Sequence, residues 1–476
     1  MKILLTGATG YIGRRLTYVL LLDNSLDIRI LVRDKNKLTE KVRENCEIVE
    51  GSTFDSVALF KAAEGVDVAY YLIHSMGSKG DFEEKDRISS QNFLAACLAG
   101  GVKRIVYLGG LGDRKNTSRH LKSRIETGEI LSSQPDKIET FWFRAGIIIG
   151  SGSASFEIIR NLVQKLPVLI TPKWVRSKSE PIGIRDVLLY LFAALHNKSS
   201  GSHIIDIGCG EKTFQGLLEG AAIKMGLKRW IIPVPFFSPQ LSSYWLVLFT
   251  PVPFSIASAL VEGLKFESIR KNNTAYEMFP DITPDSYNRA LDFAIEEIES
   301  NQILSRWSDS SDSEDAISVM NEEMGSAVFS YEVNRKITGI TEKDLFSIVK
   351  TIGGENGWFR YHFLWVLRGL LDKLAGGYGL NRGRRHPSDL RTGDSIDFWK
   401  VVDFKDTSRL LLYAQMKLPG KGWLEFVVAK GHYIQTAYFL PKGLWGRLYW
   451  FGFLPVHKLI FLNMANQIIK KSMSKK

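Results

Sequence analysis

The sequence MKILLTGATGYIGRRLTYVLLLD, residues 1–23, predicts a strand, a glycine-rich turn and a helix in that order. Residues 2–6 form a short apolar run that suits a buried strand. Apolar side chains then recur at helical spacing, at Leu16, Val19, Leu20 and Leu22. A strand followed by a turn and a helix is the repeating unit of a parallel α/β sheet.

The turn carries glycines with the spacing G-x-x-G-x-x-G. This spacing lets the backbone approach a pyrophosphate, whose charge then lies at the N-terminus of the helix. A glycine pattern alone is a weak signal, but this one follows a strand, opens a helix and precedes a second strand at residues 28–32. We therefore expect the turn to bind a nucleotide, through Gly7, Ala8, Thr9, Gly10, Tyr11, Ile12 and Gly13.

The residue that closes the second strand selects between NAD(H) and NADP(H). An acidic side chain there would hold the ribose 2′-hydroxyl, whereas a basic one would pair with a 2′-phosphate. The residue is Arg33, and Lys35 and Lys37 follow it, so NADP(H) is the expected cofactor. Asp34 leaves NAD(H) as the alternative.

Strand and helix patterns alternate up to residue 150, which predicts an α/β fold with a doubly wound parallel Rossmann sheet. With TGATGYIG, VRD, IHSMG, FRAGIIIG and EPIGIRDV in this order, residues 1 to about 300 resemble the atypical or extended short-chain dehydrogenase/reductases, in the branch that is similar to NmrA or to complex I accessory subunits. The resemblance implies contacts along the cofactor after the fourth strand, by Ile73, His74 and Ser75. It also implies that the nicotinamide faces Ala145 and Gly146. Where the family often has an aspartate that holds adenine, this chain has Ser52 and Thr53.

Reduction in this superfamily rests on a Tyr-x-x-x-Lys pair one helical turn apart and on a serine after the fifth strand. The matching positions hold His120 and Arg124, and the strand ends in Gly109 and Gly110. An imidazole ordinarily titrates near neutral pH, so His120 would exchange the proton while Arg124 binds ribose and phosphate. The alternative is a domain that binds the cofactor without turning it over, as regulatory members of the family do.

Residues 151–304 stand where this superfamily builds a small substrate lobe, and the candidate substrate contacts there are Trp174 and Arg176. Within this range, residues 230–261 carry no charge, which on hydropathy alone suggests a membrane span. Prolines leave only residues 240–250 uninterrupted, and eleven helical residues cover about 16 Å, about half of a bilayer core. We therefore expect a buried or interfacial element, with membrane contact as the open alternative.

Residues 305–318, rich in serine and aspartate, predict a linker to a second domain at 319–476. This domain shows a strand, two helices and four successive strands, and ends in a long apolar helix from Gly443 to about Lys471. The order resembles the α+β helix-grip fold of START-like carriers, whose antiparallel sheet and last helix enclose apolar ligands. A solid core without a cavity is the alternative. With GGENGWF, RTGDSIDFWKV and PVHKLIF as local matches, nearly all of the chain resembles a bacterial family whose C-terminal part is catalogued only as uncharacterised.

The chain has 476 residues and a formal net charge of +11, and the whole basic surplus lies in residues 316–476, with 24 basic and 13 acidic side chains. Because its aromatic residues follow the apolar pattern, this domain suits a hydrophobic small molecule or an anionic membrane surface, and no nucleic acid.

Three scattered cysteines favour a cytoplasmic protein without a metal site, with peripheral attachment at the inner face of the membrane as the alternative. The sequence thus predicts an NADP(H)-dependent oxidoreductase for a hydrophobic substrate, or else a cofactor-binding sensor or hydrophobic-ligand carrier.

Overall fold

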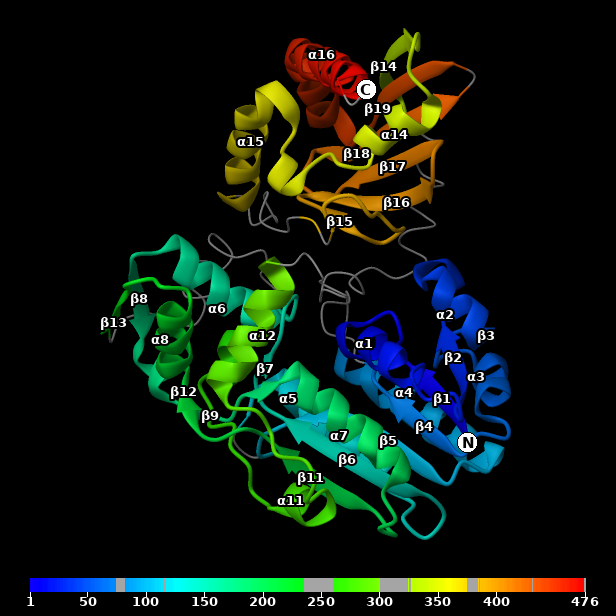
Figure 1. The fold of residues 1–476 in the computed structure, drawn as a ribbon, viewed down its shortest axis with the longest axis vertical. Coiled ribbons are helices and arrows are strands. Elements are labelled where there is room, and N and C mark those ends of the chain that lie inside the picture. Colours follow the sequence, from blue (N-terminus) through cyan, green and yellow to red (C-terminus); the bar gives the residue numbers. More distant parts are fainter. Residues whose placement is uncertain are drawn as a thin grey trace. The chain divides into compact units, whose positions relative to one another are not determined.

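The computed structural model describes residues 1–73, 82–114, 117–234, 260–299, 324, 327–374, 384, 386–429 and 431–474. The chain divides into two compact units, Met1–Ser311 and Asp312–Lys476 (Figure 1). The predicted domain boundaries at residues 304 and 319 lie outside the described residues and stay predictions.

A seven-stranded sheet forms the centre of the N-terminal unit, with all neighbouring strands parallel and in the order β11-β6-β5-β4-β1-β2-β3. This confirms the predicted doubly wound Rossmann sheet. Its strands are β1 (Lys2–Thr6), β2 (Asp27–Val32), β3 (Glu47–Glu50), β4 (Val68–Tyr71), β5 (Arg104–Gly110), β6 (Glu139–Ala145) and β11 (His203–Ile207).

Helices cover both faces of this sheet, because each parallel neighbour needs a crossover connection (Figure 1). On one face α1 packs against α7, and on the other α4 packs against both α3 and α5. The helices are α1 (Tyr11–Leu20), α2 (Glu40–Asn45), α3 (Ser56–Ala63), α4 (Phe82–Gly100), α5 (Arg119–Leu131), α7 (Ile184–His196) and the short α11 (Thr274–Met278).

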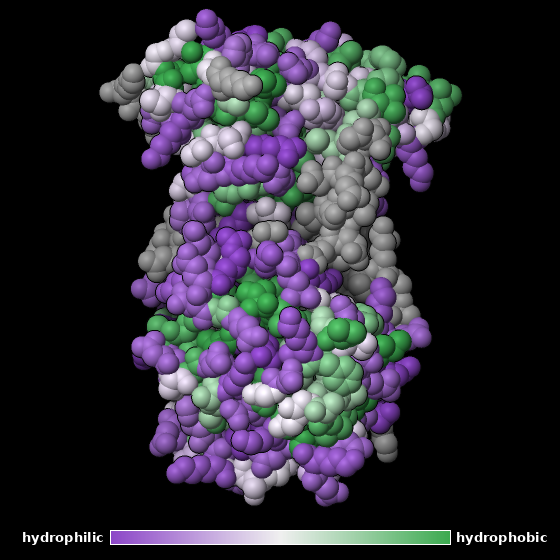
Figure 2. Space-filling model, turned by 90° about the vertical axis from the view of Figure 1, so that its right-hand side faces the viewer, coloured by the Kyte–Doolittle hydropathy of each residue, from purple (hydrophilic) through white to green (hydrophobic). Residues whose placement is uncertain are grey.

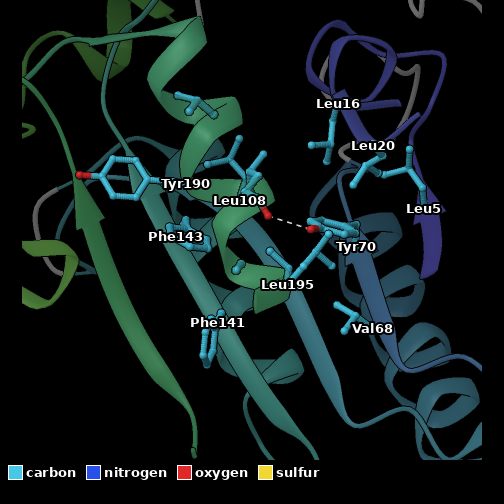
Figure 3. Packing of buried hydrophobic residues seen from close by; sticks show 14 of the residues in the cluster. Leu5, Leu16, Leu20, Val68, Tyr70, Leu108, Phe141, Phe143, Tyr190 and Leu195 are labelled. Atoms are coloured by element: carbon cyan, nitrogen blue, oxygen red, sulfur yellow. Dashed lines mark hydrogen bonds between the residues drawn. The ribbon is translucent and has the colours of Figure 1, made fainter. Parts of the chain in front are cut away.

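Strand β1 buries side chains on both faces. Ile3 and Leu5 belong to the core shared with α1 and α7, whereas Leu4 belongs to the core on the opposite face. Figure 3 shows the first core, in which the Tyr70 hydroxyl donates to the carbonyl of Leu191 on α7 at 2.7 Å. Burial on both faces explains why residues 2–6 are a continuous apolar run and show no alternation.

A smaller lobe has its own hydrophobic core, to which α6 (Ala154–Lys165), α8 (Phe214–Lys224) and α12 (Tyr287–Glu299) contribute. It also contains a parallel pair, β8 (Val168–Pro172) with β13 (Trp230–Val234). Two short pairs lie next to it, β7 (Ile148–Ile149) with β10 (Ile182–Gly183) and β9 (Lys178–Ser179) with β12 (Lys212–Thr213).

The predicted lobe range of 151–304 was too broad, because α7 and β11 fall inside it and return to the Rossmann sheet. The lobe is therefore discontinuous in sequence. Most of the uncharged stretch, residues 235–259, lies outside the described residues. Among the helices that the structure describes, none is both long enough and apolar enough to cross a membrane.

The C-terminal unit contains a six-stranded antiparallel sheet in the order β14-β19-β18-β17-β16-β15. The four predicted strands in succession and the long last helix are confirmed. The resemblance to the helix-grip fold of START-like carriers stays a prediction. The elements are β14 (Phe329–Lys336), α14 (Glu342–Val349), α15 (His362–Leu374), β15 (Ser395–Ile396), β16 (Trp399–Lys405), β17 (Arg409–Ala414), β18 (Gly420–Ala429), β19 (His432–Pro441) and α16 (Gly443–Met473).

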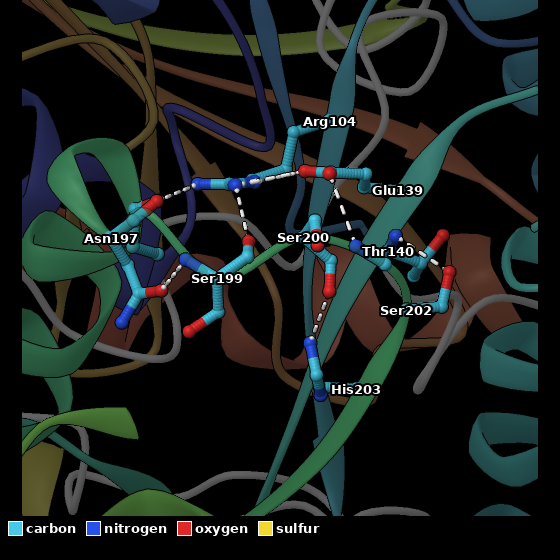
Figure 4. Close-up of polar contacts among 10 residues, drawn as sticks. Arg104, Glu139, Thr140, Asn197, Ser199, Ser200, Ser202 and His203 are labelled. Atoms are coloured by element: carbon cyan, nitrogen blue, oxygen red, sulfur yellow. Dashed lines mark hydrogen bonds and ion pairs between the residues drawn. The ribbon is translucent and has the colours of Figure 1, made fainter. Parts of the chain in front are cut away.

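A polar network fastens the amino edge of the Rossmann sheet (Figure 4). Arg104, the first residue of β5, forms an ion pair with Glu139, the first residue of β6, at 2.8 Å. The same guanidinium donates to backbone carbonyls just after α7, including those of Asn197 at 2.8 Å and Ser199 at 3.1 Å. Because these contacts lie at the edge opposite the glycine-rich turn, we assign Arg104 to stability.

We expect Arg104→Ala to destabilise the N-terminal unit by about 2–3 kcal/mol, because several carbonyls and a carboxylate lose their donor. Lys103→Ala is the matched control: the Lys103 side chain is 78% exposed and pairs with Asp67, so its loss should cost less than about 0.5 kcal/mol. Urea unfolding of both variants, with NADPH titration beside it, measures this. Equal stability of the two variants would contradict the assignment.

Candidate functional site

The glycine-rich turn joins β1 to α1 with no room for a side chain at Gly7 or Gly13. Gly7 has a φ of +76°, and a Cβ on it would lie 2.6 Å from the carbonyl oxygen of Leu72. A Cβ on Gly13 would lie 2.7 Å from the carbonyl carbon of Gly7 and overlap its oxygen. The glycines therefore let α1 start directly behind β1, which brings the helix N-terminus to the carboxyl edge of the sheet.

The first turn of α1 suits an anion. It contains no acidic residue, and its N-cap, Gly10, offers no side chain to the backbone N–H groups. Such N–H groups and the helix dipole are the usual partners of a pyrophosphate. Ala8 is buried, while Thr9, Gly10 and Ile12 are half-buried.

The side chain of Tyr11 is directed into the protein. Its ring lies 5.1 Å from the guanidinium carbon of Arg15, and a Cβ on Gly150 would lie 2.5 Å from its hydroxyl. Arg15 in turn pairs with Glu297 of α12 at 2.9 Å. Burial raises the pKa of Tyr11 well above its usual range. Tyr11 thus contributes its backbone to the turn, while its ring joins α1 to the smaller lobe.

Of the three basic residues after β2, Arg33 is exposed at the strand end. Lys35 pairs with Glu50 at 3.1 Å, and Lys37 is buried. Because β1 and β2 are parallel neighbours, Arg33 lies at the same edge as the glycine-rich turn. This is the position at which a cofactor ribose is recognised in Rossmann folds.

Thr53 is buried, and its hydroxyl lies 2.6 Å from the hydroxyl of Ser89 on α4. Its carbonyl accepts from the side-chain amide of Asn92 at 2.8 Å. Ser52 is half-buried, and its hydroxyl accepts from the backbone N–H of Phe54. The polar atoms of Thr53 therefore hold α4 in place, and a contact with adenine would fall to Ser52.

Ile73, after β4, is half-buried and packs against the core formed with α4. His74 and Ser75 lie outside the described residues. Of the candidate substrate contacts, Arg176 is exposed and the side chain of Trp174 lies outside what the structure describes. Both therefore stay predictions as substrate contacts.

Arg124 lies beside the carboxyl end of β5. Its guanidinium donates to the carbonyl of Leu108, and its own backbone carbonyl accepts from the Tyr107 hydroxyl at 2.9 Å. His120 is half-buried one turn earlier on the same helix, α5, which Ser118 caps by accepting from the backbone N–H of Leu121. The helix therefore places both residues at the edge where the cofactor would lie.

Two partly buried ion pairs that the sequence did not indicate fix the carboxyl end of β6 and segments after it. Arg144 makes two contacts with Asp206 of β11, at 2.6 and 2.9 Å. The carboxylate of Glu180 binds the guanidinium of Arg270 and also accepts from its backbone N–H at 2.9 Å. A Cβ on Gly146 would meet the carbonyl of Glu180, so these pairs also set the backbone beside the expected nicotinamide position. The partners are 62 and 90 residues apart, beyond the reach of a local pattern.

A small pocket of about 10 Å³, room for about one water molecule, lies between β10, α7 and α12. Asp186 and Glu297 are among its lining residues. Burial raises the pKa of Asp186 to about 6, although its carboxylate accepts from the backbone N–H of Asp285. The pocket is too small for an organic substrate.

Two families match parts of the chain. A family described as NAD(P)H-binding matches residues 7–134, which contain the glycine-rich turn, Arg33 and α5. A family described as a protein of unknown function (DUF2867) matches residues 325–464, most of the C-terminal unit. A search of curated proteins gives no match. The N-terminal unit is therefore an NAD(P)-binding Rossmann domain, followed by a DUF2867 domain.

Solved structures show the same fold. A nucleoside-diphosphate-sugar epimerase from Staphylococcus aureus is 18% identical, with a TM-score of 0.50 over 61% of this chain and 99% of its own. A triphenylmethane reductase from Citrobacter sp., solved with NADP(H), is 17% identical, with a TM-score of 0.51 over 61% and 99%. At these identities the likeness establishes the Rossmann fold.

We expect Gly13→Ala to lower NADPH affinity by more than about tenfold, because the methyl group would push α1 away from the carbonyl of Gly7. Gly216→Ala in α8 is the control, since its Cβ would meet its nearest neighbour, the Thr213 hydroxyl, at 3.4 Å. Fluorescence titration of both variants with NADPH measures this. Wild-type affinity in Gly13→Ala would show that the turn does not hold the nucleotide.

Proposed function

We propose that this chain is an NADP(H)-dependent oxidoreductase that acts on a hydrophobic substrate. The observation that carries the proposal is the meeting of the glycine-rich turn, the N-terminus of α1 and exposed Arg33 at one edge of a parallel sheet. The match of residues 7–134 to an NAD(P)H-binding family supports it. So does the Citrobacter reductase, which has this fold and was solved with NADP(H).

Each residue then has a distinct role. The N–H groups of the turn and of α1 would bind the pyrophosphate, and Arg33 would pair with the 2′-phosphate. Bound NADP(H) supplies or accepts a hydride at the nicotinamide. Arg124, held by the carbonyl of Leu108, would bind the ribose, and His120 would give the substrate oxygen a proton or remove one.

A cofactor-binding sensor or carrier is the second candidate, and one observation favours it. The guanidinium of Arg124 is already bound to the carbonyl of Leu108, so it is less available to a ribose than the lysine of the usual pair. In this function the same edge binds NADP(H), but no proton is transferred there.

The cofactor choice is tested at Arg33. We expect Arg33→Ala to weaken NADPH binding by about tenfold or more and to leave NADH binding within about twofold, because a charged contact to the 2′-phosphate is lost. Arg43→Ala, an exposed arginine on α2, is the control and should change neither affinity. Equal affinities of the wild-type protein for NADPH and NADH would refute the NADP(H) preference.

Turnover is tested at His120, with apolar quinones, ketones and aldehydes as probes and NADPH oxidation as the readout. We expect His120→Ala to lower kcat by about 10² to 10⁴ while the Kd for NADPH stays unchanged, because only proton transfer is removed. Arg119→Ala is the control, since Arg119 is exposed and pairs with Glu83. Unchanged turnover in His120→Ala would remove this histidine from the mechanism. Binding of NADPH without turnover of any probe would favour the sensor or carrier.

A further inference from the structure

Helix α15 of the C-terminal unit exposes its apolar side. Between residues 362 and 372 its buried positions are Trp365, Gly369 and Asp372. Its opposite face repeats at i, i+3, i+4, i+7 and i+8 and carries five large apolar side chains that are 48–62% exposed: Phe363, Val366, Leu367, Leu370 and Leu371. A helix that covers a protein core has the reverse pattern.

The first half of α16 has the same property. From Gly443 to Leu459 only Gly446 and Trp450 are buried, whereas the second half packs on the sheet through Phe461 and Met464. The exposed apolar residues of the first half are Leu444, Trp445, Leu448, Phe451, Phe453, Val456 and Leu459. With the five residues of α15 they form what we call the α15–α16 face.

This face is unusual for a protein surface. In the described part of the chain 29 large apolar side chains are exposed, and 12 of them belong to this face. Figure 2 shows the side of the C-terminal unit opposite α15, where hydrophobic residues are mixed with hydrophilic ones. On the two helices the exposed apolar side chains are concentrated instead. Apolar surface gathered in this way marks an interaction site.

Arg368 joins the two helices. It projects from α15, donates to the carbonyl of Lys417 at 2.9 Å, and lies near the hydroxyl of Tyr449 on α16, whose pKa burial raises despite this positive charge. Burial, with Arg368 close by, lowers the pKa of His457 on α16 to about 4. The imidazole is therefore neutral at physiological pH and adds no charge to the face.

The charges around the face are positive. Residues 426–476 contain eight basic residues and no acidic one. Lys442, Arg447 and Lys458 are exposed along the first half of α16. The acid of α15, Asp372, is fully buried and accepts from the backbone N–H of Lys417 at 2.7 Å. A second copy of this face would bring like charges together, whereas an anionic surface complements them.

We propose that the α15–α16 face attaches this protein to an anionic lipid bilayer, with both helices lying in the interface. Apolar and aromatic side chains would enter the boundary of headgroups and acyl chains while the basic residues remain among the phosphates. Arg384 takes no part in this, since it is buried and its guanidinium donates to the carbonyls of Ile352 and His386. The proposal concerns the C-terminal unit and holds whether or not the Rossmann domain turns over NADP(H).

Flotation of the full chain with phosphatidylcholine vesicles, with and without phosphatidylglycerol, tests the proposal. We expect binding to the anionic vesicles, and about tenfold weaker binding to neutral vesicles or at high salt. Two double variants, Leu367→Glu with Leu371→Glu and Trp445→Glu with Leu448→Glu, should each lower the partition coefficient by about tenfold or more. Leu189→Glu with Ile223→Glu, at exposed positions of the N-terminal unit, is the matched control and should bind as the wild type does.

All variants should keep the wild-type unfolding temperature and NADPH affinity, because the substituted side chains are exposed. The proposal fails if the wild type does not float with anionic vesicles, or if the variants of the face bind as well as the control. It also fails if the wild type forms a dimer in solution that the same variants dissociate. Vesicle binding without NADPH binding would refute the proposed function and support this inference.

Discussion

The N-terminal unit depends on one close backbone approach, between Gly13 and the carbonyl of Gly7. No side chain fits there, and the positive φ of Gly7 is one that glycine adopts readily. Because of this approach α1 begins directly behind the central strand, and its N-terminus lies at the edge where the parallel strands end. Arg33 and Arg124 reach the same edge from β2 and α5. The candidate site thus results from the order of the parallel strands and from the close approach of Gly13 to the carbonyl of Gly7.

Charged residues occur at both edges of the Rossmann sheet, and their surroundings separate structural from functional roles. Arg104 and Glu139 bind each other and nearby carbonyls at the amino edge, so their polar atoms are used within the domain. Arg144 with Asp206, and Glu180 with Arg270, do the same after β6. Arg33 differs in being exposed at the carboxyl edge. An exposed charged side chain at the carboxyl edge therefore indicates a binding role more strongly than its charge alone does.

In the C-terminal unit only some of the helices pack their apolar side against the sheet. α14 and the second half of α16 share a hydrophobic core with the sheet. α15 contributes Trp365 to that core and turns its apolar side outward, and the first half of α16 does likewise. An isolated domain gains nothing from such exposure, because burying apolar side chains is the main driving force of folding. We therefore attribute the exposure to a binding partner. The basic residues around the α15–α16 face favour an anionic lipid surface as that partner.

Local patterns in the sequence determined much of this protein. The strand and turn of residues 2–13, the alternation of strands and helices, the four successive strands and the long last helix depend on residues a few positions apart, so all were predicted. Tertiary structure decided the rest. It returned α7 and β11 to the main sheet, paired Glu180 with Arg270 across 90 residues, engaged the hydroxyl of Thr53 within the core, and divided α16 into a packed and an exposed half. An apolar helix has the same sequence pattern whether it faces a core or a bilayer, and only the position of the neighbouring elements distinguishes the two.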